Sequence, residues 1–212
     1  MKLLTKDNGR LESFSDGVFA FAATLLVVSL EVPDSFDLLK AQLSGFISFG
    51  VSFGALVLIW RTHYNYFRRT TCRDNVVVTI NMILLFVVLY FVYPLKFLAM
   101  AIFNRSNYNI KIDSANDLAE LFILYGIGFT LIFLCFAILY WRSAKKDIEV
   151  KEELLFYKRH FLIFAIIGCL SIILAIFEVG IKIGFPGVIY GLLGPICYIH
   201  GKWTSKNKVV DL

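Results

Sequence analysis

Charged side chains are scarce in this sequence of 212 residues. Asp, Glu, Lys and Arg together make up 17% of it, whereas about 25% is usual for a soluble domain. Apolar residues take their place, at 58% of the chain, and they gather in long runs. Because runs of about 20 apolar residues match the thickness of a bilayer core, a soluble globular domain is excluded. The sequence predicts an all-α, polytopic membrane protein.

Cysteine motifs and processing signals are also missing. The four cysteines lie far apart and none has C-x-x-C spacing, which argues against a metal or redox motif and favours buried free thiols. They are Cys72, Cys135, Cys169 and Cys197. The first apolar run is longer than the core of a signal peptide and no A-x-A-like cleavage site follows it, so we expect it to remain as a helix. The net charge of +5 is interpreted as a sign of membrane orientation, and no nucleic-acid partner is expected.

Six apolar runs are long enough to cross a bilayer. They cover roughly residues 12–31, 42–62, 76–99, 117–140, 160–178 and 183–201. The last two are the shortest and lie close together. We expect Gly180 and Gly184 to form the tight turn between them.

Lysine and arginine are concentrated in alternate connections. All the basic segments fall on one side of the membrane if there are six helices and both termini are cytosolic. A five-helix arrangement would break this alternation, so we expect one six-helix transmembrane domain over residues 1–212. The basic residues are Lys2, Lys6 and Arg10; Arg61, Arg68, Arg69 and Arg73; Arg142, Lys145, Lys146, Lys151, Lys158 and Arg159; and Lys202, Lys206 and Lys208.

The connection before the fifth run has opposite charges at helical spacing. Lys145 with Glu149, and Asp147 with Lys151, are four residues apart, where such pairs support a helix. This pattern predicts a cytosolic helical extension with a solvated face.

Small residues recur along the second run. Ser44, Ser48 and Ser52 are spaced by four, and Gly50 with Gly54 forms G-x-x-x-G. Small side chains at this spacing let another helix approach closely. We expect them to pack against the first helix.

An acidic residue stands near the start of the first run. Asp16 needs a partner at its own depth, because an ionisable group in a membrane helix is costly. The second helix ends and the third begins on that side. A structural network is therefore predicted at the cytosolic end, made up of Arg10, Phe14, Ser15, Asp16, Trp60, His63 and Asn81. Ser15 and Asp16 point about 100° apart on one helix and no oxyanion-hole glycines accompany them, so this is not expected to be an enzyme.

Thr24 lies in the middle of the same helix, on the flank of an apolar stripe. The stripe consists of Phe14, Val18, Phe21, Leu25 and Val28. One interpretation is that the Thr24 hydroxyl only bonds the carbonyl four residues back. The other is a pore wall, in which large apolar side chains form a constriction and a hydroxyl partly hydrates an ion. The residues alone do not favour either.

Taken together, these residues resemble a known family. The R-x-x-x-F-S-D pattern of Arg10, Phe14, Ser15 and Asp16 is similar to the signature of the lysosomal potassium channel family, transmembrane protein 175 and its prokaryotic relatives. Trp60-x-x-His63 at the end of the second helix, and Asn81 followed by Pro94 in the third, also resemble that family.

The resemblance implies a prokaryotic homotetramer, since this chain carries one six-helix repeat. It also implies a potassium-permeable cation channel in the cell membrane, with no cofactor, no metal beyond the permeant potassium ion, and no T-V-G-Y-G filter. The first helix of each subunit would line a central pore, with a hydrophobic constriction at Phe21, the selectivity threonine at Thr24 and a further apolar layer at Val28. Phe21 departs from the usual Ile or Leu, so the constriction is expected either there or at Leu25 and Val28.

Two other classes of function are compatible with the polar residues. A proton-coupled secondary transporter would use Asp16 and His63 as a relay. The absence of an internal repeat disfavours it, since duplicated transporter folds commonly show such symmetry. A membrane enzyme or a purely structural protein is the third class.

Overall fold

In the computed structural model of the chain, the described residues are 4–28, 34–36, 46–103 and 114–210. They contain helices and no strand. The long helices are α1 (Leu4–Val28), α3 (Phe46–Arg69), α4 (Asn75–Phe103), α5 (Ala115–Ala144) and α6 (Lys151–Ile176). The short elements η1 (Ile181–Ile183), α7 (Phe185–Val188) and η2 (Ile189–Leu192) then lead into α8 (Leu193–Val210). The all-α prediction is therefore confirmed.

Five helices are long and apolar enough to cross a membrane, namely α1, α3, α4, α5 and α6. They coincide with the first five predicted runs. The sixth run, residues 183–201, falls on α7, η2 and the start of α8, where a 3₁₀ segment interrupts the helix. This stretch is not among the five spans found in the described residues, so the count of six remains a prediction.

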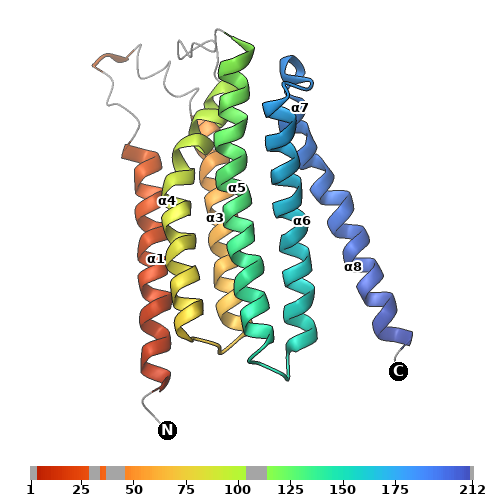
Figure 1. Cartoon of the computed structure of the whole chain (residues 1–212). Helices are drawn as coiled ribbons and strands as arrows, with labels where there is room; N and C mark the ends of the chain where they lie inside the picture. Colours follow the sequence, from red (N-terminus) through yellow and green to blue (C-terminus); the bar gives the residue numbers. More distant parts are fainter. Residues whose placement is uncertain (1–3, 29–33, 37–45, 104–113, 211–212) are drawn as a thin grey trace. The chain divides into compact units, whose positions relative to one another are not determined.

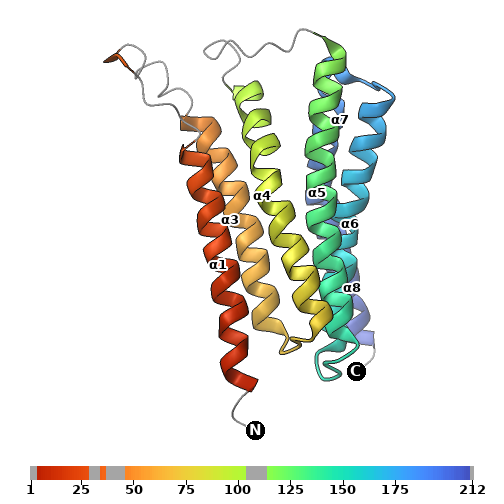
Figure 2. The same ribbon diagram turned by 60° about the vertical axis from the view of Figure 1, so that its left-hand side comes forward.

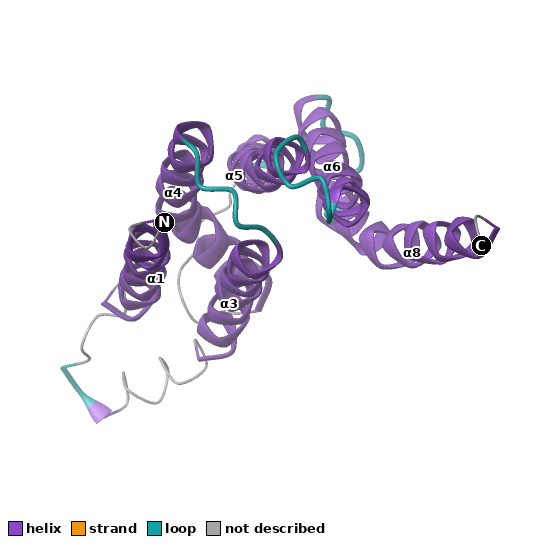
Figure 3. Ribbon diagram, turned by 90° about the horizontal axis from the view of Figure 1, so that it is seen from below, coloured by secondary structure: helices purple, strands orange, loops and turns teal. Residues whose placement is uncertain are grey.

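The chain divides into two compact units, residues 1–68 with 85–113 and residues 69–84 with 114–212. In the first unit, α1 and α3 lie side by side with the part of α4 from Leu85 onward (Figures 2 and 3). Its core includes Phe19, Ala22, Leu26, Leu56, Ile59, Val88, Phe91 and Val92. In the second unit α5 and α6 pack along their length, while α8 leans away from α6 (Figure 1).

Glycines bring α5 and α6 together. A β-carbon on Gly168 would lie 2.3 Å from the Thr130 hydroxyl, and one on Gly126 would lie 2.6 Å from the Ile172 side chain. The predicted packing of Gly50 and Gly54 against the first helix is wrong, because a β-carbon on either would meet nothing within 4 Å among the described residues. Ser44 of the same pattern lies outside those residues. The serines of α3 turn inward instead. Ser48 and Ser52 are fully buried.

The two turns at the ends of α6 differ in how well they were predicted. Gly180 and Gly184 have φ of +64° and +69° on either side of η1, so the tight turn is confirmed and needs residues that tolerate positive φ. The helical extension is wrong for residues 145–150, which form turns between α5 and α6. There Asp147 accepts bonds from the Thr70 hydroxyl and the Thr71 amide, so its carboxylate stabilises a distant loop. The helix predicted beyond this point begins at Lys151.

Candidate functional site

Helix α1 has two faces with different surroundings. Ser15, Phe19, Ala22 and Leu26 are buried, and their spacing of three or four places them on one side of the helix. Phe21 and Val28, on the opposite side, are 56% and 71% exposed. Thr24 is exposed between them, whereas Leu25 is half-buried. One chain therefore leaves an apolar face uncovered, and between Phe21 and Val28 the Thr24 hydroxyl is the one polar side-chain group on it.

Thr24 lies near the centre of this exposed face, which differs from the predicted stripe because Val18 and Leu25 of that stripe are half-buried. With about 100° per residue, Thr24 falls within about 60° of Phe21 and about 40° of Val28 around the helix axis. Its hydroxyl donates to the carbonyl of Ala20 at 3.0 Å, as the packing interpretation expects. The hydroxyl oxygen keeps lone pairs that can accept another partner, so this bond is compatible with a pore wall too.

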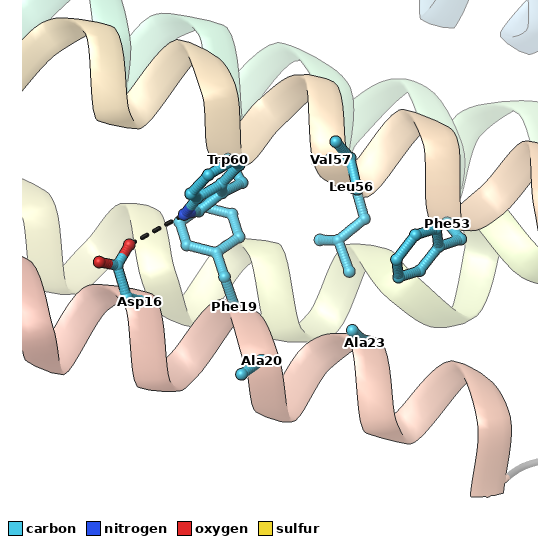
Figure 4. Close-up of a pocket in the computed structure, with 8 residues that line it drawn as sticks. All are labelled: Asp16, Phe19, Ala20, Ala23, Phe53, Leu56, Val57 and Trp60. Atoms are coloured by element: carbon cyan, nitrogen blue, oxygen red, sulfur yellow. Dashed lines mark hydrogen bonds between the residues drawn. The ribbon is translucent and has the colours of Figure 1, made fainter.

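The Asp16 carboxylate accepts a hydrogen bond from Trp60, another residue of the predicted network. The indole Nε1 of Trp60 on α3 donates to the Asp16 Oδ1 at 2.8 Å, and Figure 4 shows Trp60 reaching across from α3 to α1. This pair stands at one end of a groove of about 360 Å³ between the two helices. The other lining residues are Phe19, Ala20, Ala23, Phe53, Leu56 and Val57. Since they are all apolar, Asp16 is the one ionisable group among the residues that line the groove.

His63 is buried on α3, one turn after Trp60 and about 60° away from it around the helix. Its ring lies 5.3 Å from that of Phe19 and 4.7 Å from that of Phe67, measured between centroids. The contact joins α3 to the buried face of α1. Phe19 was not predicted as a site residue, although its spacing of four from Ser15 marks the same face.

The other predicted network residues lie as follows. Ser15 is buried and donates to the Leu11 carbonyl at 2.8 Å, while Asp16 beside it is exposed. This separation agrees with the argument against a hydrolase. Arg10 and Phe14 are exposed on α1. Asn81 is fully buried on α4, in the part of that helix that belongs to the second unit.

Lys96 on α4 is not among the site residues predicted from the sequence. It is only 8% exposed and its Nζ lies 3.4 Å from the Leu26 carbonyl oxygen of α1. The signal was present, because an ionisable residue inside an apolar run marks a candidate functional position.

The loop between α3 and α4 is tied to α5 and α6 within the second unit. Asp74 accepts from the Val77 amide at 3.0 Å, which caps α4, and pairs with Arg142 at 2.6 Å. Arg69 pairs with Glu153 at 3.2 Å and donates to the Tyr157 hydroxyl at 3.0 Å. Burial raises the pKa of the Asp74 carboxyl, but the bonds from Arg142 and Val77 and the Arg142 charge outweigh it, so this pKa lies below its ordinary value.

Within the described residues, no three His, Cys, Asp or Glu side chains gather where they could hold a metal ion. The groove between α1 and α3 thus offers the Asp16 carboxylate and its bond to Trp60, and the exposed face between Phe21 and Val28 offers the Thr24 hydroxyl among apolar side chains.

Known proteins are similar to this chain in both sequence and fold. Residues 10–92 match the family described as endosomal/lysosomal potassium channel TMEM175. A relative from Marivirga tractuosa named "Potassium channel" is 35% identical over 224 residues, covering 95% of this chain and 90% of the relative.

Two solved structures are also similar. One is a crystal structure of a variant of the potassium channel MtTMEM175 in complex with a nanobody–MBP fusion protein. Its TM-score is 0.74, with 32% identity and 93% of each chain covered. The other is of a lysosomal potassium-selective channel TMEM175 homologue from Chamaesiphon minutus, with a TM-score of 0.54 and 24% identity over 89% of this chain and 98% of that one. At that identity the second shows the fold alone.

Proposed function

The chain belongs to the endosomal/lysosomal potassium channel TMEM175 family, and from that premise we propose that it is a potassium-permeable cation channel of the cell membrane. Ions would pass through a central pore lined by α1 from each of four identical subunits. The membrane and the permeating monovalent cations would be its other partners. Relatives named as potassium channels support this class over an enzyme.

The exposed face of α1 is the observation that carries the proposal. Phe21 and Val28 are large apolar side chains that their own chain leaves uncovered, with the Thr24 hydroxyl between them. Four such faces around an axis would form rings of apolar side chains and one ring of hydroxyls. Apolar rings gate by dewetting, and hydroxyl oxygens replace part of the hydration shell of an ion. A constriction of this kind would take the place of a carbonyl filter.

The constriction is assigned to Phe21 and Val28 rather than to Leu25. Leu25 is half-buried and lies about 100° away from Thr24 around the helix. Phe21 and Val28 flank Thr24 by about one turn on either side.

Flux into liposomes that contain the purified protein tests the proposal. A potassium gradient should drive current without a proton gradient. Absence of current under both potassium and sodium gradients would overturn the channel. Strict dependence on a proton gradient would instead establish the transporter that uses Asp16 and His63.

A further inference from the structure

Lys96 is a charged residue in an otherwise apolar part of α4. It follows Asn75, the first residue of α4, by 21 positions, which corresponds to about 30 Å along the helix. That length matches a bilayer core, so Lys96 lies near its far edge. Its neighbours Leu95 and Ala99 are buried, as is Lys96 itself. A buried ammonium at this depth requires a polar partner.

One partner in the first unit is the carboxyl-terminal part of α1. The Lys96 Nζ approaches the carbonyl oxygen of Leu26 at 3.4 Å, two residues before α1 ends at Val28. This distance is long for a hydrogen bond, so the attraction is mainly between the ammonium charge and the helix dipole. A cation is favoured there, because the carboxyl end of a helix carries partial negative charge.

The same stretch of α4 also holds α3. The Ser48 hydroxyl donates to the Ala99 carbonyl at 3.1 Å, and Ala99 lies three residues after Lys96. Two polar contacts therefore attach α1 and α3 to one region of α4.

The middle of α1 is attached through Asp16, which accepts from Trp60 at 2.8 Å. Asp16 and Leu26 are ten residues apart, or about 15 Å along the helix. Phe21 and Thr24 lie between the two attachments. Two polar anchors on one side of a helix fix its rotation about its own axis, which a uniformly apolar contact does less well.

We infer that Lys96 is a positioning residue that fixes the rotation of α1 and so sets the direction in which Thr24 and Val28 point. The inference rests on the proposed function, in which this face lines the pore. A side chain tip lies about 5 Å from the helix axis, so a rotation of about 30° would displace the Thr24 hydroxyl by roughly 2.5 Å. A displacement of that size separates an oxygen that contacts an ion from one that does not.

Lys96→Met tests the inference, with Lys96→Arg as the conservative variant. Lys182→Met is the matched control, because Lys182 is exposed on η1 in the second unit. The first readout is the potassium-to-sodium permeability ratio in liposomes. The second is disulfide formation between subunits that carry Val28→Cys, with the exposed Cys169 and the half-buried Cys197 replaced by serine.

We expect Lys96→Met to keep the oligomer and to lower both readouts by about threefold, the equivalent of an average interhelical polar contact in a membrane. Lys96→Arg should keep the permeability ratio and the disulfide yield of the unsubstituted chain, and Lys182→Met should change neither quantity. Unaltered readouts in Lys96→Met would overturn the inference while leaving the channel intact.

Failure of the proposed function is distinguishable from this outcome. In that case the unsubstituted chain carries no current, and Val28→Cys alone forms no disulfide between subunits. Lys96→Gln is a second variant, used in case Lys96→Met fails to fold. If both Lys96→Met and Lys96→Gln lose the oligomer, Lys96 is required for assembly and its assignment as a positioning residue is overturned.

Discussion

Trp60 donates its indole hydrogen to the carboxylate of Asp16 at 2.8 Å, and this bond joins α3 to α1. The two residues are 44 positions apart in the chain. Because Asp16 stands beside the buried Ser15, the bond also determines which side of α1 faces inward. Phe21, Thr24 and Val28 then lie on the opposite, exposed side of α1.

Trp60→Phe should loosen this attachment. Phenylalanine keeps an aromatic ring but has no donor for the Asp16 carboxylate, so we expect a loss of about 0.6 kcal/mol, the average for an interhelical hydrogen bond in a membrane. Thermal unfolding of the detergent-purified protein measures it as a lower Tm. Trp141→Phe is the control, since Trp141 contacts Lys145 through its ring, which phenylalanine retains. Equal Tm values for the two variants would contradict the anchoring role of Trp60.

Thr24→Val should lower the preference for potassium over sodium while the oligomer stays intact. Valine has the shape of threonine, and the hydroxyl bond goes to the Ala20 carbonyl of the same helix, so little stability is lost. Reversal potentials under mixed-ion gradients measure the preference. Thr79→Val is matched to it, because the exposed Thr79 bonds the Asn75 carbonyl in the same way. An unchanged ion preference in Thr24→Val would remove Thr24 from the selectivity site.

Phe21→Ala and Val28→Ala should each raise basal potassium flux. Removing a large apolar side chain from a narrow ring makes wetting easier. Leu25→Ala should have a smaller effect, because Leu25 is half-buried. Phe86→Ala serves as the control for loss of an exposed phenylalanine, since Phe86 is 73% exposed on α4. A larger increase in Leu25→Ala than in Phe21→Ala would move the constriction to Leu25.

Much of the fold could be predicted from the sequence because a bilayer imposes it. Long apolar runs must be helical where lipid leaves no other partner for the backbone, so five spans were found. The turn at Gly180 and Gly184 followed from the positive φ that glycine tolerates. In contrast, the turn at Asp147 depends on Thr70 and Thr71, which are distant in sequence, so a local charge pattern could not reveal it.

The two faces of α1 were harder to predict for a physical reason. Both are apolar, so the hydrophobic period does not distinguish the side that packs on protein from the side that faces lipid or a pore. The apolar stripe that has Thr24 on its flank includes the half-buried Val18 and Leu25, so it does not coincide with the exposed face that has Thr24 near its centre. The contact of Lys96 with Leu26 depends on the neighbouring position of α1 and α4. The unusual lysine was visible in the sequence, but its partner was not.

Asp74 should make stability depend on pH in the acidic range. Its pKa is lowered in the folded protein, so its contribution is fully present above the ordinary carboxyl pKa and is lost as pH falls through the folded value. Asp74→Asn keeps a side-chain oxygen that can cap α4 but removes the charge that pairs with Arg142. We expect a loss of about 0.2–1 kcal/mol at neutral pH, as for a partly exposed ion pair.

The pH dependence separates the ion pair from the helix cap. Between about pH 6 and pH 3, Tm should fall more steeply for the unsubstituted protein than for Asp74→Asn, because the substituted amide does not titrate. Asp74→Ala also removes the acceptor of the Val77 amide and should cost about 1 kcal/mol more at every pH. Parallel Tm curves for Asp74→Asn and the unsubstituted protein would show that the Asp74–Arg142 pair contributes nothing to folding. In that case the cap alone would account for the role of Asp74 at the start of α4.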